Sequence, residues 1–128
     1  MPKTLSLAVL LLLFTSFASA ATSAPCAHFS YNITPSMVAP DGPTTLTGAL
    51  TNCSTAAHSY RVVFKVVGPN NLVFFHFQSF FMRAGKTLSE SITDAAPDTK
   101  GEYFVTIKVL SATGTLLAGP ETKSFTVE

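Results

Sequence analysis

The side chains best suited to catalysis or metal binding in this sequence are three histidines, seven carboxylates and two cysteines. His28, His58 and His76 are far apart and lack the short spacings that zinc ligands usually show. Asp94 and Asp98 share one loop, which lacks the dense acidic pattern of a dedicated calcium site. Neither a Gly-x-Ser-x-Gly elbow nor a glycine-rich phosphate loop occurs. We therefore predict no catalytic, metal or cofactor site. A hydrolase whose Ser, His and Asp meet only in the folded chain ranks third among the functions considered.

The first 20 residues have the three parts of a secretory signal peptide. Lys3 gives a positive start, the run from Leu5 to Phe14 is almost wholly apolar, and Ala18-Ser19-Ala20 forms a small-x-small cleavage site. The apolar run is shorter than the roughly 20 residues of a membrane-spanning helix, so a permanent anchor is the weaker alternative. We predict a signal peptide at 1–20 and one domain at 21–128, secreted or periplasmic, with no membrane span after signal removal.

If the chain is exported, its two cysteines are expected to be oxidised. In an oxidising compartment, Cys26 and Cys53 are expected to form one disulfide, and two free thiols are the alternative. Two Asn-x-Ser/Thr sequences begin at Asn32 and Asn52, and both would be candidate glycosylation sites on exposed positions if the source were eukaryotic. Because Pro35 follows the first and Cys53 lies inside the second, both are poor acceptors.

Composition and charge narrow the class of protein further. Apolar residues make up 47% of the chain and charged residues only 12%, which excludes a solvated disordered tail. Without Lys3, the basic and acidic residues would balance at seven each. A chain with zero net charge carries no electrostatic footprint for nucleic acid or an anionic membrane.

Period-two alternation of apolar and polar residues runs through the chain, and turn residues separate the segments. This pattern predicts an all-β, seven-stranded antiparallel sandwich, with a barrel as the alternative. Glu90 falls on the same strand face as Leu88 and Ile92, which places it near the rim of the core. Gly119-Pro120 interrupts the last strand and predicts a bulged or edge strand. The expected strands are 29–34, 45–51, 60–67, 72–82, 87–93, 103–110 and 115–127.

Several short motifs resemble those of bacterial immunoglobulin-like domains. Pro40-Asp41-Gly42 precedes a Thr-rich strand, Arg83-Ala84-Gly85-Lys86 precedes a Ser/Thr-rich one, and Gly101-Glu102-Tyr103-Phe104-Val105 is similar to the penultimate strand of fibronectin type III-like and cell-adhesion-related (CARDB-type) domains. The resemblance implies an immunoglobulin-like Greek key and a corner tyrosine at Tyr103, whose hydroxyl bonds the preceding loop, with a plain core tyrosine as the alternative. The chain departs from antibody domains because it has no Trp and its cysteines cannot form the usual inter-sheet pair.

One segment concentrates more than half of the phenylalanines that lie outside the signal peptide. Either the rings plug both ends of the core, or several are exposed and form a partner or self-association surface. An exposed aromatic edge strand could also accept another strand. The candidate surface consists of Phe74, Phe75, Phe77, Phe80, Phe81, Met82 and Arg83.

The sequence therefore predicts a secreted, non-enzymatic module that binds a protein partner or a second copy of itself through this segment. The alternative is a small exported inhibitor or a carrier of an apolar ligand. An inhibitor would use the loop from Asn52 to Ser59, and a carrier would show a cavity lined by the same phenylalanines.

Overall fold

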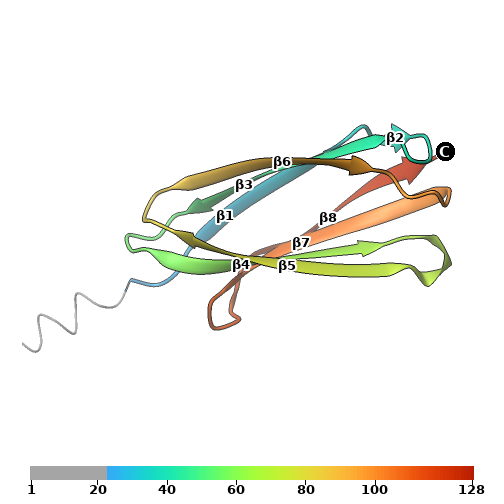
Figure 1. Ribbon diagram of the computed structural model, residues 1–128. Helices are drawn as coiled ribbons and strands as arrows, with labels where there is room; N and C mark the ends of the chain where they lie inside the picture. Colours follow the sequence, from blue (N-terminus) through green and yellow to red (C-terminus); the bar gives the residue numbers. More distant parts are fainter. Residues whose placement is uncertain (1–22) are drawn as a thin grey trace, which may run out of the picture.

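The computed structural model describes residues 23–128, so the predicted signal peptide lies outside the described residues. These residues form two β-sheets stacked face to face (Figure 1). Between residues 23 and 128, no helix is long and apolar enough to cross a membrane. The strands are β1 (Ala27–Thr34), β2 (Met37–Val38), β3 (Pro43–Asn52), β4 (His58–Val67), β5 (Val73–Met82), β6 (Thr87–Ala95), β7 (Gly101–Ser111) and β8 (Leu116–Val127), and a short 3-10 helix, η1 (Pro69–Asn71), joins β4 to β5.

The two sheets differ in size. One has three strands in the order β1-β3-β6, and the other has five in the order β2-β8-β7-β4-β5. All pairs are antiparallel except β2 with β8. The predicted all-β sandwich is confirmed at this level, with eight strands in place of seven. The additional strand, β2, spans only two residues, which is too short for alternation to reveal.

The core lies between the inward faces of the sheets. The core forms because alternate side chains of each strand point inward. Strand β7 shows this most clearly: Tyr103, Val105, Ile107 and Val109 are buried, and the residues between them are not. A buried polar group needs a partner, and the Tyr103 hydroxyl donates a 2.6 Å hydrogen bond to the Thr99 carbonyl oxygen in the preceding loop. The corner tyrosine implied by the family resemblance is therefore confirmed.

Strand β8 bends where its sequence predicts an irregularity. Its pairing with β7 shifts register between Ile107 and Leu110, next to the Gly119-Pro120 pair. Gly119 has φ of +77°, and a Cβ there would lie 2.7 Å from the Ile107 carbonyl oxygen, so only glycine fits. The predicted bulge is confirmed. Strand β2 pairs only with Thr126 and Val127, so the Gly119-Pro120 part of β8 is paired with β7 alone, as in an edge strand.

The predicted disulfide between Cys26 and Cys53 is present. It joins the start of β1 to the end of β3, two neighbours in the three-stranded sheet, with the Cα atoms 5.0 Å apart. The Cys53 amide also donates to the Cys26 carbonyl oxygen at 3.2 Å. The bond therefore clamps one end of a ladder within a sheet and does not link the two sheets.

The prediction that Asn52 is exposed is wrong. Its side chain is fully buried, and its amide nitrogen donates to the carbonyl oxygens of Ala56 and Met82, each at 3.0 Å. Its side-chain oxygen accepts a hydrogen bond from the Ser54 amide. The folded chain therefore has no free Asn52 amide for glycosylation, whereas Asn32 on β1 is exposed.

Candidate binding site: the aromatic strand and the cleft beside it

Strand β5 carries the aromatic segment along the edge of the five-stranded sheet, where β4 is its only neighbour. Phe74, Phe75, Phe77 and Phe81 have exposed fractions between 55% and 71%, which are high for phenylalanine. Phe80 is half-buried. Of the two arrangements considered from the sequence, the structure has most of the rings exposed.

Met82 and Arg83, the last two residues of the predicted surface, differ in their exposure to solvent. Arg83 is exposed, in the turn after β5. Met82, expected on this surface, is buried and packs in a core cluster with Leu50 and Tyr60. Its burial follows from pairing: Met82 lies opposite His58 at the end of β5 that is anchored to the Asn52 side chain.

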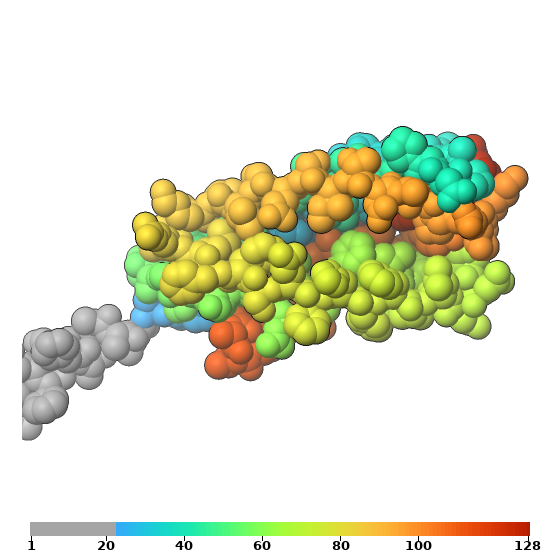
Figure 2. All heavy atoms as spheres, in the orientation of Figure 1, coloured from blue at the N-terminus to red at the C-terminus, as the bar shows by residue number. Residues whose placement is uncertain are grey.

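Alternate residues of β5 line a cleft between the two sheets. Phe74, His76, Gln78 and Phe80 form one wall, and β6 forms the opposite wall. The cleft has a volume of about 690 Å³, which lies within the roughly 300–1,000 Å³ of small-molecule sites. Figure 2 views the molecule from this side, and atoms of the inner strands are visible between β6 and β5.

The floor and walls of the cleft are mainly apolar. The register explains this, because Leu46 lies opposite Ile92 and Leu50 opposite Leu88, so one apolar stripe crosses β3 and β6. Ile92 is 57% exposed although it faces inward, since no strand covers it from the other sheet. The apolar lining residues include Leu46, Leu50, Val62, Phe64, Leu88 and Ile92.

The cleft lining also contains a few polar side chains from β3 and β6. Thr44 lies directly opposite Asp94, and Glu90 lies opposite Gly48. Among the described residues, the Thr44 hydroxyl is buried and has no hydrogen-bond partner. A buried hydroxyl without a partner is costly. Thr44 and Asp94 therefore form a polar end to an apolar cleft. Glu90 lines the rim on edge strand β6, where the alternation of β6 places it.

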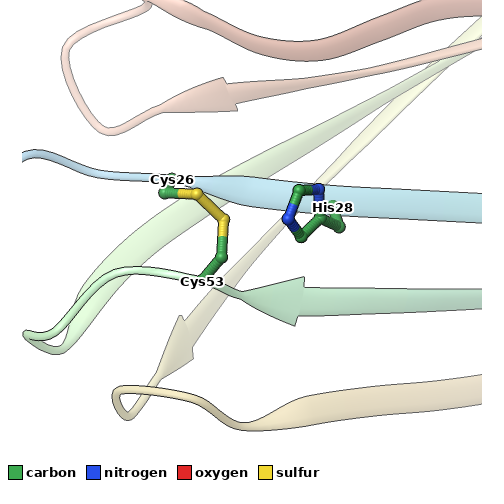
Figure 3. Close-up of side chains that lie close together, drawn as sticks. All are labelled: Cys26, His28 and Cys53. Atoms are coloured by element: carbon green, nitrogen blue, oxygen red, sulfur yellow. A yellow bond between two sulfur atoms is a disulfide. The ribbon is translucent and has the colours of Figure 1, made fainter.

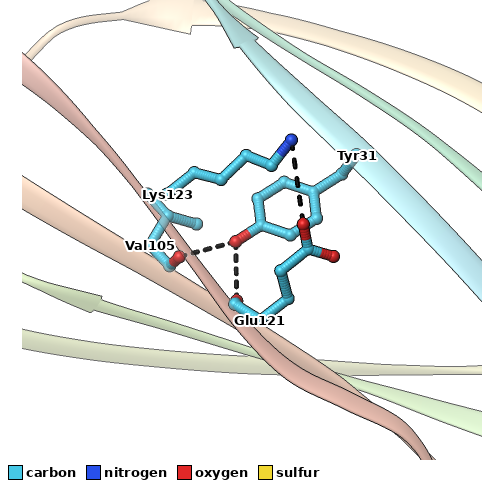
Figure 4. A network of polar contacts seen from close by, with 4 residues as sticks. All are labelled: Tyr31, Val105, Glu121 and Lys123. Carbon is cyan, nitrogen blue, oxygen red and sulfur yellow. Dashed lines mark hydrogen bonds and ion pairs between the residues drawn. The ribbon is translucent and has the colours of Figure 1, made fainter.

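The sandwich is closed on its other side by Tyr31 (Figure 4). Its hydroxyl lies 2.8 Å from the Val105 carbonyl oxygen and 2.6 Å from that of Glu121, so one proton is shared between β7 and β8. Burial, and secondarily the Glu121 charge, raise the pKa of Tyr31 to about 12. The Lys123 ammonium lies 5.3 Å from the Tyr31 ring centroid and 3.8 Å from the Glu121 carboxylate. These contacts join β1 to the five-stranded sheet and leave the β5–β6 side as the opening.

The outer face of β5 has a different chemistry. Arg61 lies over the ring of Phe77 and Lys65 over that of Phe75, each with 5.5 Å to the ring centroid. Exposed cation–π contacts of this kind contribute about 0.5–1 kcal/mol each. The outer rings are therefore partly covered by cations from β4, whereas the backbone edge of β5 is not covered.

His28 lies beside the disulfide, on β1 (Figure 3). The two sulfur atoms and one ring nitrogen of His28 all lie within 4.8 Å of one another. Sulfur atoms joined to each other are not thiolates, which are the form that binds metals. In the oxidised protein this cluster offers one imidazole ligand.

One Ser–His contact forms in the β3–β4 loop. His58 Nε2 lies 3.1 Å from Ser54 Oγ. The Ser54 side chain is buried, and its oxygen also accepts a hydrogen bond from the Ala56 amide. A serine nucleophile needs a base that a third group orients, and no described carboxylate bonds His58. The contact stabilises the β3–β4 loop, which the sequence suggests as the binding loop of an inhibitor.

Two carboxyl groups meet near one end of the sandwich. A hydrogen bond with Asp98, followed by the charge of Asp98, raises the pKa of Asp41. The Asp41 amide donates to the Ala96 carbonyl oxygen at 3.2 Å, which holds the β2–β3 turn against the β6–β7 loop. Asp94, expected in the same loop as Asp98, lies at the end of β6, where it is exposed and lines the cleft.

No family model matches the chain, and no curated protein matches it. Several solved structures share its fold. A β-glucosidase from Erythrobacter marinus has a TM-score of 0.62 at 9% identity, covering 81% of this chain and 16% of that one. The alkylpurine DNA glycosylase AlkC from Pseudomonas fluorescens has a TM-score of 0.60 at 16% identity, covering 81% and 30%. The chain thus spans less than a third of either enzyme.

A third match is close in length to this chain. The CARDB domain of the PF1109 protein from Pyrococcus furiosus, solved in complex with di-metal ions, has a TM-score of 0.58 at 14% identity. The alignment covers 81% of this chain and 87% of that domain. At such identities the likeness concerns the fold alone, and it supports a CARDB-like β fold for this chain.

Proposed function

We propose that this protein is a non-enzymatic binding module that holds the apolar part of a small amphiphilic ligand between its sheets. The cleft of about 690 Å³ beside β5 is the observation that carries the proposal. Apolar walls with a few polar groups are typical of small-molecule sites. Two of the five phenylalanines of the aromatic segment, Phe74 and Phe80, line this cleft, which supports the carrier alternative.

The polar groups of the cleft indicate the kind of head group. The Thr44 hydroxyl lacks a partner, and the neighbouring Asp94 and Glu90 carboxylates accept hydrogen bonds and attract positive charge. A ligand with an alkyl or aromatic body and an amine or hydroxyl head matches this arrangement. A fatty acid does not, because its carboxylate would meet carboxylates.

The proposal also covers the compartment of the protein and the connectivity of its strands. The disulfide is compatible with a secreted or periplasmic protein, since such bonds persist in oxidising compartments. The chain passes between the sheets on either side of β2, between β3 and β4, and on either side of β6, which supports an immunoglobulin-like Greek key.

A second candidate function is binding of a protein through the β5 edge. The observation in its favour is that four phenylalanines of β5 are exposed along a strand that is paired on one side only. Exposed aromatic clusters of this size are characteristic of interaction surfaces. Both functions can coexist, because the cleft uses the inward face of β5 and strand pairing uses its edge.

Binding of the neutral apolar dye N-phenyl-1-naphthylamine, followed by fluorescence, tests the cleft. We expect saturable binding and displacement by a long-chain amine or alcohol, but much weaker displacement by a fatty acid of equal length. Gly48→Leu should lower the dye affinity at least tenfold, because Gly48 lines the cleft and a Cβ there meets its nearest neighbours at 3.6 Å, leaving room for the side chain to point inward.

Thr47→Leu is the matched control, since Thr47 is the preceding residue of β3 and is not in the cleft lining. Equal dye affinity in the two variants, or no saturable binding by the unmodified protein, would refute the proposal. If Gly48→Leu fails to fold, Ile92→Lys replaces it, because Ile92 lines the cleft but is more than half exposed.

A further inference from the structure

The sandwich has four sheet edges, and three of them are protected from pairing with another chain. Strand β1 is tied to the opposite sheet by Tyr31 and lies alongside β8, so these two strands cover each other's edges, and β2 is only two residues long. Strand β6 carries Glu90 and Asp94, which face the cleft. Tied or very short edges and inward-pointing charges are the devices by which natural sheets avoid edge-to-edge association.

Strand β5 has none of these protections. It is ten residues long, contains no charged residue and no proline, and pairs with β4 alone. The backbone groups directed away from β4 therefore lack a partner strand, and backbone N–H and C=O groups strongly favour pairing. The contrast with β6, which borders the same cleft, indicates that the β5 edge is kept open for a strand.

We propose that β5 pairs antiparallel with β5 of a second copy of this chain, with a two-fold axis at Phe77. In this register Phe74 lies opposite Phe80 of the second copy, and His76 lies opposite Gln78. The outward residue Phe77 lies opposite its own copy. Aromatic cross-strand pairs and a His–Gln hydrogen bond stabilise such a ladder.

The sequence of β5 favours a second copy over an unrelated strand. Its cleft-facing residues read Phe-His-Gln-Phe, so reversal of the strand places aromatic on aromatic and polar on polar. Strand β5 itself brings no like charges together because it has no charged residue, and the nearby cations Arg61 and Lys65 come from β4 and lie over the outer rings. With four rings of about 150–250 Å² each and more than half exposed, two strands offer on the order of the 1,000 Å² that a specific interface needs.

This dimer goes beyond ligand binding and rests on the edge of β5 alone. A two-fold axis perpendicular to the sheet would join the five-stranded sheets of both copies into one. Both three-stranded sheets would then lie on the same face, and the two clefts would open towards each other across the seam. The interface would therefore enclose the mouths of both clefts.

Sedimentation velocity of the oxidised protein over a hundredfold concentration range tests this pairing. We expect a dimer that Phe77→Lys dissociates, because this change places two positive charges face to face on the axis. Phe77 is 64% exposed and does not line the cleft, so the variant should fold and still bind the dye saturably. Phe104→Lys is the control, because Phe104 is also exposed but lies on the inner strand β7.

The register has its own test. Phe77→Lys mixed with Phe77→Glu should restore a dimer that neither variant forms alone, because opposite charges then meet on the axis. A monomer at every concentration, a dimer that survives Phe77→Lys, or no recovery in the mixture would overturn the pairing. Dye titrations of the same samples report on the cleft separately, so failure of the dimer and failure of ligand binding are distinguishable.

Discussion

Tyr31 and Tyr103 each place a hydroxyl against backbone carbonyl oxygens, but at different points of the sandwich. Tyr103 holds the loop before β7, and Tyr31 connects β1 to β7 and β8. Both rings are buried, so loss of either hydroxyl leaves carbonyl oxygens without their donor. At the scale of single residues, Tyr31 has the further property that it titrates differently in the folded and unfolded chain.

The raised pKa of Tyr31 predicts a loss of stability at high pH. The unfolded chain releases this proton near pH 10, whereas the folded protein keeps it until about pH 12. The contribution is complete below pH 10, and the free energy of unfolding should fall between pH 10 and 12. Burial raises the pKa of Tyr60 too and acts in the same direction. Urea unfolding at a series of pH values measures this fall.

Tyr31→Phe supplies the comparison for that titration. The variant starts less stable, because it lacks the hydrogen bonds to β7 and β8, but its decline across the same pH window should be shallower. A decline as steep as that of the unmodified protein would show that other groups cause it.

Single residues were predictable where local sequence decides their role. Tyr103 lies near the start of β7, and its hydrogen bond to Thr99 spans four residues. Asn52 was misplaced because its burial depends on Met82, which is distant in sequence and reaches Asn52 only in the folded sandwich. The unpaired Thr44 hydroxyl had no local signal at all.

At the scale of elements, the disulfide acts on the β1–β3 ladder. It joins residues 27 apart, and closing a loop of this size in the unfolded chain is worth about 3–4 kcal/mol in the chain-entropy model. Replacing both cysteines by alanine should lower the free energy of unfolding by about that amount, measured by urea unfolding. Thiol reduction of the unmodified protein should reproduce the loss and leave the double variant unchanged. A variant of unaltered stability would contradict the entropic account.

Strands with one apolar face were predicted from alternation, because burial repeats every second residue. Strand β5 left two outcomes open, since rings occupy both of its faces and the sequence does not say which neighbours cover them. Its exposure follows from two facts of tertiary structure: it is the last strand of its sheet, and the opposite sheet has only three strands.

At the scale of the whole molecule, the Tyr31 contacts join the two sheets on one side, whereas the cleft separates β5 from β6 on the other. Strand β7 is paired on both sides and carries half of the largest fully buried side chains, whereas β5 and β6 are each paired on one side. We therefore expect amide hydrogen exchange to be slowest in β7 and much faster in β5 and β6. Exchange followed by mass spectrometry should show that a cleft ligand slows β6 and the inner strands selectively. Uniform exchange across both sides would contradict this gradient.

From the sequence, a cavity lined by phenylalanines was only an alternative, because the volume of the cleft depends on the spacing of two sheets along an uncovered side. The alternation placed Glu90 on an inward face, and that was the one trace of a polar group in the cleft. The balanced net charge also concealed the position of Arg61 and Lys65, which lie side by side with the aromatic rings on one outer face.

The order of strands has a consequence for how the chain folds. Strand β6 pairs with β3 across the intervening β4–β5 hairpin, whose turn at Gly68–Asn71 is local. Local hairpins form faster than pairings between distant segments. We therefore expect the uncharged aromatic edge to be complete before β6 arrives beside it. Until β6 is in place, a partly folded chain exposes this edge to pairing with other chains. The yield of refolding should therefore fall steeply as protein concentration rises.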